Sequence, residues 1–154
     1  MPKLNSKVNR RQAEFKLSLS GYVKAEKQIL QSINHPFIIK FVKTMKNDYW
    51  FFYVLEYVHG QILEEYLLQR INTRNAPETR FYIASLLLTI DYLNKKCITH
   101  RDIKPNNIKI DMNGYLKLFD FGTAKYVKGP TYTVIGTPHY IAPEVLNGKG
   151  YTFQ

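Results

Sequence analysis

Apolar and polar positions follow two different periods along this chain, and the period changes near residue 60. Residues 22–33 place apolar side chains at helical spacing, and Pro36 then interrupts the pattern. Residues 37–45 and 49–58 are rich in β-branched and aromatic residues on either side of a short polar segment. The first part of the chain is therefore predicted to form a helix followed by two antiparallel strands.

After residue 60 the apolar positions recur at helical spacing. A short amphipathic helix is predicted over 62–71 and a long helix over 77–96, which starts near Pro77. Residues 107–119 alternate again and contain Asn113-Gly114, a strong signal for a hairpin turn. Residues 120–154 contain many Gly, Pro and Thr residues and are expected to be loop-like.

This order of elements predicts an α+β fold with a strand-rich part before a helix-rich part. We expect a cleft at their junction, near residues 55–60. A chain of 154 residues is long enough for one domain, or part of one, with a sizeable core. Because 45% of the residues are hydrophobic and 14% are aromatic, the composition excludes a disordered tail.

The formal net charge of +10 favours a polyanionic partner. The basic residues are nevertheless spread along the chain apart from residues 3–12, so we expect a solvated basic face and no nucleic-acid partner. Cys97 is the only cysteine, which favours a reducing compartment and a cytoplasmic location. The apolar runs are too short to span a membrane, so no membrane partner is expected.

Residues 100–107, HRDIKPNN, combine a carboxylate, an amine and an amide within six positions. Phosphoryl transfer uses such a set, because a carboxylate can accept the hydroxyl proton while a cation and a metal ligand manage the phosphate charge. A polar loop after a helix is the plainer alternative. The motifs DFG at 120–122 and APE at 142–144 follow in order. Together the three motifs resemble those of protein kinases.

The closest resemblance is to the serine/threonine protein kinases of the cyclic-nucleotide-dependent branch, activated by cAMP or cGMP. The segments AEKQIL, HPFI, LEYV, AKYVKG and TYTVIGTPHYIAPE carry it. The resemblance implies a partial protein-kinase-like fold, with residues 1–56 as a remnant of the small lobe and 57–154 as the first part of the large lobe. It also implies ATP and Mg²⁺ as cofactors and a protein substrate with Ser or Thr hydroxyls.

The resemblance assigns catalytic roles to Asp102, Lys104 and Asn107, with Asn107 and Asp120 holding the metal. Glu26 resembles the helix glutamate that pairs with a phosphate-anchoring lysine. Lys7, nineteen residues upstream, is the candidate for that lysine. The Val-Ala-Ile-Lys context is absent, so a solvated lysine in a basic N-terminal stretch remains an alternative.

Glu56 and Val58 resemble the residues that offer a backbone carbonyl and amide to the adenine edge, although they also suit a simple strand end. A stacked apolar spine is expected from Leu30, Phe41, His100 and Phe121.

Thr133 resembles an activation-loop phosphorylation site, and Arg101 and Lys125 resemble the cations that would bind its phosphate. Its modification is expected from an upstream kinase or by autophosphorylation. Thr137 resembles the threonine that bridges the catalytic Asp and Lys, and solvated loop threonines are the alternative.

The sequence departs from the kinase pattern ahead of Lys7, where no glycine-rich phosphate loop is present. It also ends before the helices that normally support the catalytic loop. A catalytically inactive pseudokinase-like binding module or a truncated gene product is therefore an alternative to an active kinase. We expect little phosphotransfer from this chain by itself, and exposed apolar surface on the long helix.

Three acidic positions that kinases of this branch use to bind substrate arginines are also changed. Gln61-Ile62 replace Gly-Glu after the hinge, Asn106 replaces Glu in the catalytic loop, and His139 replaces Glu in GTPHY. Weak attraction to arginine-rich peptides is expected, unless Glu64 or Glu65 compensates.

Overall fold

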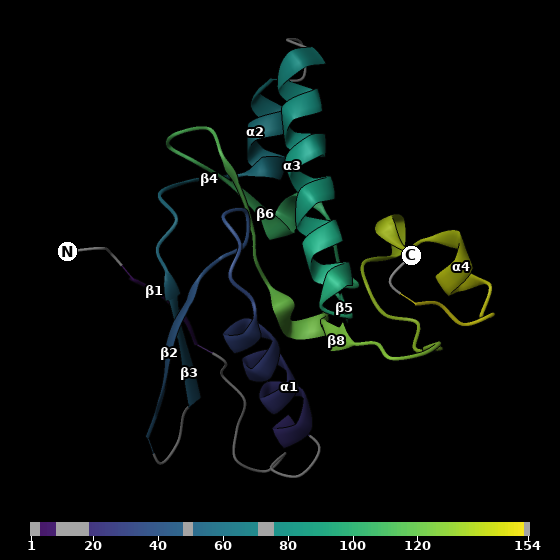
Figure 1. Ribbon diagram of the computed structural model, residues 1–154. Helices are drawn as coiled ribbons and strands as arrows, with labels where there is room; N and C mark the ends of the chain where they lie inside the picture. The colour runs from purple at the N-terminus through teal and green to yellow at the C-terminus, as the bar shows by residue number, and fades with distance from the viewer. Residues whose placement is uncertain (1–3, 9–18, 48–50, 71–75, 153–154) are drawn as a thin grey trace.

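The computed structural model begins with a three-stranded antiparallel sheet and one helix. It describes residues 4–8, 19–47, 51–70 and 76–152. In spatial order the strands are β1 (Leu4–Val8), β3 (Phe51–Glu56) and β2 (Phe41–Lys46). Helix α1 (Leu19–Ser32) lies beside the sheet (Figure 1) and buries Ile29 and Leu30. The described residues of this part thus form a sheet with α1 packed near it.

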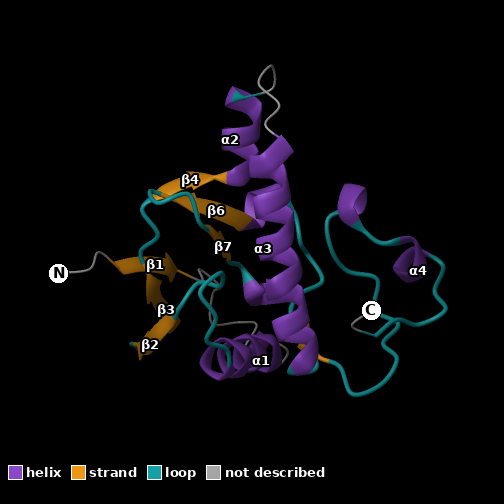
Figure 2. Cartoon of the chain, turned by 45° about the horizontal axis from the view of Figure 1, so that its top comes forward, coloured by secondary structure: helices purple, strands orange, loops and turns teal. Residues whose placement is uncertain are grey.

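The second part is built on two helices and a second sheet. Strand β4 (Gly60–Ile62) leads directly into α2 (Leu63–Gln69) and then α3 (Ala76–Lys95). The hairpin of β6 (Ile108–Asp111) and β7 (Leu116–Leu118) pairs with β4 in the order β4-β6-β7. Figure 2 shows this sheet beside α3. Residues 100–107, which resemble a kinase catalytic loop and are called the catalytic loop below, therefore lie between α3 and the β6–β7 hairpin in the chain and lead directly into β6.

Shorter elements complete the second part. They are β5 (Ile98–Thr99), the 3-10 helix η2 (Pro105–Asn107), η3 (Phe121–Thr123), β8 (Lys125–Tyr126), η4 (Pro138–Tyr140) and α4 (Pro143–Leu146). Strands β5 and β8 pair antiparallel, which ties the segment before the catalytic loop to the segment after η3.

One hydrophobic core joins the two parts. It contains Ile29 from α1, Leu55 from β3, Leu118 from β7 and Phe121 from η3. The backbone continues this link, because the Ile39 N–H donates to the Leu118 carbonyl at 2.9 Å. The sheet of the first part and the hairpin of the second are therefore held in one packed body.

The predicted helices and hairpins are confirmed, with shifted ends. Helix α1 starts at Leu19, three residues before the predicted start, and β2 begins at Phe41, after an isolated bridge at Ile38. Pro36 and the turn that follows it explain the later start of β2. The pattern did not reveal β4, β5 or β8, because strands of two or three residues carry too little periodicity.

Helix α3 carries an exposed apolar face, as the sequence predicts. Phe81, Ile83, Leu87 and Leu88 are 43–60% exposed, whereas Leu93 is 2% exposed. Of the described helices, none combines the length and hydrophobicity that crossing a membrane requires.

Candidate active site around Asp102

The site begins with a buried histidine that fixes the loop between β5 and η2. The His100 side chain is 2% exposed and packs edge-on against Phe121, with ring centroids 4.8 Å apart. Its Nδ1 accepts from the Asp102 backbone N–H at 3.3 Å, so Nε2 carries the proton donated to the Phe119 carbonyl at 3.2 Å. Burial lowers the pKa of His100 to about 4. The imidazole is thus neutral at physiological pH and acts as a fixed support for the loop.

Asp102 is held by hydrogen bonds at both carboxylate oxygens. Oδ1 accepts from the Thr137 hydroxyl at 2.7 Å and the Thr137 backbone N–H at 3.0 Å. Oδ2 accepts from Asn107 Nδ2 at 2.9 Å and lies 3.0 Å from Lys104 Nζ. Burial alone would raise the pKa of Asp102, but these bonds and the Lys104 charge outweigh it and lower the pKa. The carboxylate is therefore ionised and fixed in orientation.

Thr137 connects the catalytic loop to a segment more than thirty residues later in the chain. Lys104 Nζ donates to the Thr137 hydroxyl at 2.6 Å, and that hydroxyl in turn donates to Asp102. Gly136 allows this close approach, because a Cβ there would lie 2.7 Å from the Arg101 carbonyl oxygen and its φ is +124°. The bridging geometry expected for Thr137 is present.

The β6–β7 hairpin brings the segment that contains Asp120 back to Asn107. The Phe119 N–H donates to the Asn107 carbonyl at 2.9 Å, so the residue before Asp120 is bonded directly to the end of the loop. Asp120 has a left-handed backbone (φ 63°), and its side chain accepts from the Gly122 N–H at 3.4 Å. The hairpin therefore returns the DFG segment to the catalytic loop, as its length predicts.

The donor set at this point suits a hard cation. Asn107 Nδ2 uses its N–H groups on the Asp102 backbone and carboxylate oxygens, at 2.8 and 2.9 Å, and so keeps its amide oxygen as the acceptor it can offer a metal. With the Asp120 carboxylate this gives oxygen ligands, which Mg²⁺ prefers. No group of three or more His, Cys, Asp or Glu that could bind a metal occurs within the described ranges. The described residues thus fit Mg²⁺ that shares its coordination with phosphate and water.

Glu26 of α1 is buried and faces the DFG segment. A Cβ at Gly122 would lie 3.9 Å from Glu26 Oε1. The pKa of Tyr53 is raised by burial and by the Glu26 charge, so that ring is also close. Lys7 lies in β1 opposite Tyr53, but its side chain falls outside the described part of the structure. A Lys7–Glu26 pair therefore stays a prediction.

The segment between the two parts, residues 56–58, is fixed by hydrogen bonds and an ion pair that involve side chains. Glu56 accepts from the Lys40 N–H at 3.0 Å and pairs with Lys117 at 2.8 Å. Val58 is 5% exposed, and its carbonyl accepts from Lys109 Nζ at 3.4 Å. Lys109 is a residue that sequence reasoning missed. The available signal was a lysine between two isoleucines in a segment of alternating apolar and polar residues.

Arg101 and Lys125, the cations expected to bind a phosphate on Thr133, are not hydrogen-bonded to Thr133 in the described structure. Thr133 is exposed, and its carbonyl accepts from the Tyr151 hydroxyl at 2.6 Å. Lys125 Nζ donates to the Thr131 hydroxyl at 3.1 Å, and Arg101 Nε donates to the Thr123 carbonyl at 2.7 Å. Both cations thus bond to polar groups other than the side chain of Thr133.

An acidic group does lie beside the catalytic loop. The Asn106 amide donates to the Glu64 carboxylate of α2, and Glu64 is half-buried while Glu65 is exposed. Among the described residues Glu64 has no ion pair. Of the two candidates for compensation, Glu64 is therefore the one that the fold brings to the loop.

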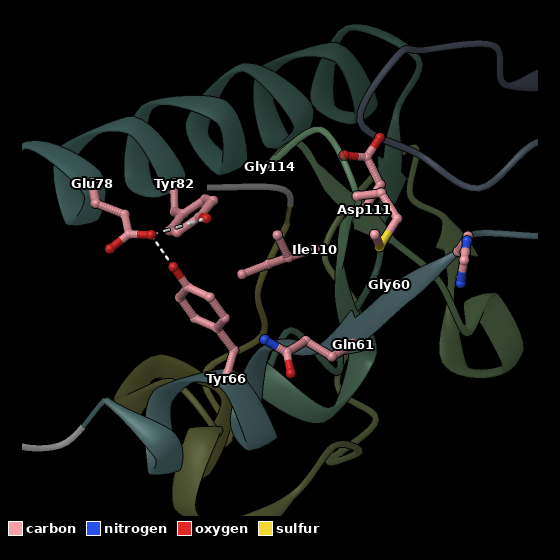
Figure 3. Close-up of a pocket in the computed structure, with 10 residues that line it drawn as sticks. Gly60, Gln61, Tyr66, Glu78, Tyr82, Ile110, Asp111 and Gly114 are labelled. Carbon is pink, nitrogen blue, oxygen red and sulfur yellow. Dashed lines mark hydrogen bonds between the residues drawn. The ribbon is translucent and has the colours of Figure 1, made fainter.

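A pocket of about 460 Å³ opens near the junction where the sequence predicts a cleft (Figure 3). It lies between residues 59–61, α2, α3 and the β6–β7 hairpin. At one end Glu78 accepts from the Tyr66 hydroxyl and pairs with Arg70 at 3.1 Å. Neither Asp102 nor Asp120 lines this pocket. All of its lining residues fall within 59–114, so it is a pocket of the second part, and the cleft expected between the two parts stays a prediction.

The predicted apolar spine residues share the core. Leu30 and Phe121 belong to the buried cluster, and Phe41 packs against it. His100 joins through its ring contact with Phe121. These contacts link α1, β2 and the catalytic loop.

Comparison with known proteins gives a consistent result. Residues 5–154 match the family model described as protein kinase domain. The chain is 42% identical over 135 residues to a cGMP-dependent protein kinase of Plasmodium berghei, covering 88% of this chain and 16% of that relative. It is 42% identical over 136 residues to the cAMP-dependent protein kinase type 3 of Saccharomyces cerevisiae, covering 88% of this chain and 34% of the relative. Against the human cAMP-dependent protein kinase catalytic subunit PRKX, the identity is 39% over 136 residues, with 88% and 38% covered.

Proposed function

This chain belongs to the protein kinase domain family, and we propose that the intact protein transfers the γ-phosphate of ATP to Ser or Thr hydroxyls of protein substrates. The observation that carries the proposal is the bonded set of Asp102, Lys104, Asn107 and Thr137. The named relatives, which are cyclic-nucleotide-dependent kinases, support the serine/threonine assignment. Because the chain spans only 16% of the first relative, activity, substrate and partners are proposals for the whole protein.

Each residue of the set has one task in this mechanism. The ionised Asp102 orients the substrate hydroxyl and accepts its proton, since hydrogen bonds at both oxygens stop the carboxylate from rotating. Lys104 offers a positive charge to the transferred phosphate, and Thr137 keeps its ammonium beside Asp102. Asn107 and Asp120 would hold Mg²⁺, which neutralises charge on the phosphates when it is bound.

The remaining residues bind the nucleotide or regulate the site. Glu56 and Val58 would offer the hinge backbone to adenine, while Lys7 and Glu26 would form the phosphate-anchoring pair. Residues 1–56 then belong to the small lobe and 57–154 to the large lobe. We also propose a cytoplasmic location for this activity.

Regulation is proposed at Thr133, whose exposure makes it accessible to an upstream kinase or to autophosphorylation. A phosphate there adds about −1.5 to −2 charges, which would attract Arg101 and Lys125 away from their present partners. Substrate selection is proposed for Glu64, whose half-buried carboxylate lies at the loop. A peptide with one basic residue near its acceptor hydroxyl suits that single charge.

Two measurements test the proposal. Mg-ATP should raise the melting temperature of the chain, and Asp120→Ala should remove this shift while Asp91→Ala, an exposed aspartate of α3, keeps it. In the intact protein, Asp102→Ala should lower kcat for peptide phosphorylation by roughly 10²–10⁴-fold. Nucleotide binding without any transfer by the intact protein would instead support a pseudokinase-like binding module. An Mg-ATP shift that persists in Asp120→Ala would contradict the metal assignment.

A further inference from the structure

Lys109 has an unusual position on the second sheet. It lies on β6 between Ile108 and Ile110, which are 3% and 5% exposed, and is itself half-buried on the opposite face of the strand. Its ammonium has a hydrogen-bond partner in the protein, because Nζ donates to the Val58 carbonyl at 3.4 Å. The lysine thus spans the distance from the β6 strand to the hinge.

The charge of Lys109 is not neutralised by a carboxylate within the described structure. Its cross-strand neighbour is Lys117, and that ammonium is paired with Glu56 at 2.8 Å. Like charges opposite each other on a sheet are destabilising. An ammonium held in this position therefore favours a ligand that brings negative charge or hydrogen-bond acceptors.

Lys109 also lies on the path of the proposed nucleotide, so a role for it there rests on the proposed function. Asn107, a proposed metal ligand, precedes it by two residues on the same segment, and Val58, a proposed base contact, is its hydrogen-bond partner. A nucleotide held by Val58 and by a metal on Asn107 would have its base near Lys109, because Lys109 bonds to the first residue and lies two positions from the second.

The chemistry of an ammonium group makes this contact selective at position 6 of the base. The group has three donors and no acceptor, and one donor is used on the Val58 carbonyl. Both kinds of purine carry the N7 acceptor, but adenine has a 6-amino donor where a 6-oxopurine has the O6 acceptor, to which an ammonium can donate. Lys109 therefore adds donors to the hinge and occupies one of its acceptors, and both changes favour an oxo base.

We infer that Lys109 is a base-reading residue of the nucleotide site, and that it admits 6-oxopurine nucleoside triphosphates in addition to ATP. The contact is a specificity determinant and takes no part in phosphoryl transfer. Its alkyl stem still covers the strand beneath the base, because lysine can bury its methylene groups while its charged end bonds elsewhere.

The test compares Mg-ATP with Mg-ITP, because the two bases differ in the 6-position and the protonation of N1. Calorimetric titration of the chain gives the ratio of the two dissociation constants. Lys109→Met should shift that ratio about tenfold toward ATP, the value of one hydrogen bond to a charged group. Lys109→Arg should keep the wild-type ratio. Lys149→Met, which removes an exposed charge elsewhere, should also keep it.

Each outcome decides between the two proposals. An unchanged ratio in Lys109→Met, with both nucleotides still bound, overturns the role of Lys109 and leaves the proposed function intact. Absence of binding of both nucleotides to the wild-type chain overturns the nucleotide site itself, and the inference with it. If Lys109→Met fails to melt cooperatively, Lys109→Leu takes its place, since it also removes every donor of the side chain and should move the ratio in the same direction.

Discussion

The catalytic loop and the outer face of α3 differ within the described chain. The polar groups of the loop have hydrogen-bond partners, whereas apolar side chains on the outer face of α3 are exposed to solvent. Asp102 has hydrogen-bond or ion-pair partners at both oxygens, and His100 beneath it is 2% exposed with both ring nitrogens bonded. By contrast, Leu87 and Leu88 of α3 are 60% and 59% exposed. Among the described residues, the polar groups of the catalytic loop are thus hydrogen-bonded, while these leucines of α3 are left exposed.

This difference follows from the range of the two kinds of interaction. A hydrogen-bonded site needs a few donors at about 3 Å, and short segments such as η2, the DFG turn and Thr137 can supply them. Covering a helix on all sides needs several packed elements. The site can therefore be in order while the scaffold still exposes apolar surface.

Among the changes that test this comparison, the largest effect is expected when the hydrogen bonds between the catalytic loop and Thr137 are removed. Thr137→Val keeps the shape but loses the hydroxyl that joins Lys104 and Asp102. A hydrogen bond to a charged group contributes about 1.5–3 kcal/mol, so kcat of the intact protein should fall roughly 10- to 100-fold. Thr137→Ser is the matched control and should retain most activity. An equal loss in both variants would show that the hydroxyl is not the group that matters.

The second largest effect is expected from acid, which should lower the free energy of unfolding through the buried His100. The folded-state pKa of His100 is about 4, below its ordinary value of 6.5, so the unfolded chain binds more protons between these values. Stability is therefore retained above pH 6.5 and lost as the pH falls, by about 2 kcal/mol between pH 7 and pH 5. Urea unfolding at both pH values measures this.

The control for the acid effect is His100→Phe, which removes the titrating group while keeping a ring beside Phe121. Its stability should change less over the same interval. The remaining change includes His35, whose pKa is also lowered by burial and by the Lys117 charge. An identical pH dependence in wild type and variant would rule His100 out as the cause.

A smaller effect is expected at the edge of the site. Glu64→Gln should raise KM about fivefold for a peptide with one basic residue near its acceptor, since partly exposed ion pairs contribute up to about 1 kcal/mol. Glu65→Gln, on the same helix but exposed, should leave KM unchanged. Kinetics with a matched neutral peptide completes the comparison, because a charge effect should vanish there.

The smallest change in stability is expected on the face of α3. Replacing Leu87 by Lys and Leu88 by Glu should alter the unfolding free energy by less than about 0.5 kcal/mol, since both side chains are already exposed. The amount of protein that stays in the supernatant should nevertheless rise, because apolar patches promote association. A large loss of stability would mean that this face is covered, and the contrast with the loop would disappear.

Much of the fold could be predicted because long elements repeat their pattern many times. Helix α3 and the β6–β7 hairpin each carry several apolar positions, and Asn113-Gly114 marks the turn. Strand β4 has three residues and β5 has two, so neither has a period to read. Their pairing depends on β6 and β8, which lie far along the chain.

The sequence by itself determined which residue types are available for phosphoryl transfer and in what order they occur. The resemblance of the motifs HRDIKPNN and DFG to those of protein kinases predicts the roles of Asp102, Lys104, Asn107 and Asp120, because each motif is a short contiguous segment. Only the tertiary structure decided that Asn106 holds Glu64, that Arg101 bonds to Thr123, and that Lys109 reaches Val58. These contacts join residues 22 to 51 positions apart, and packing of whole elements sets such distances where local sequence does not.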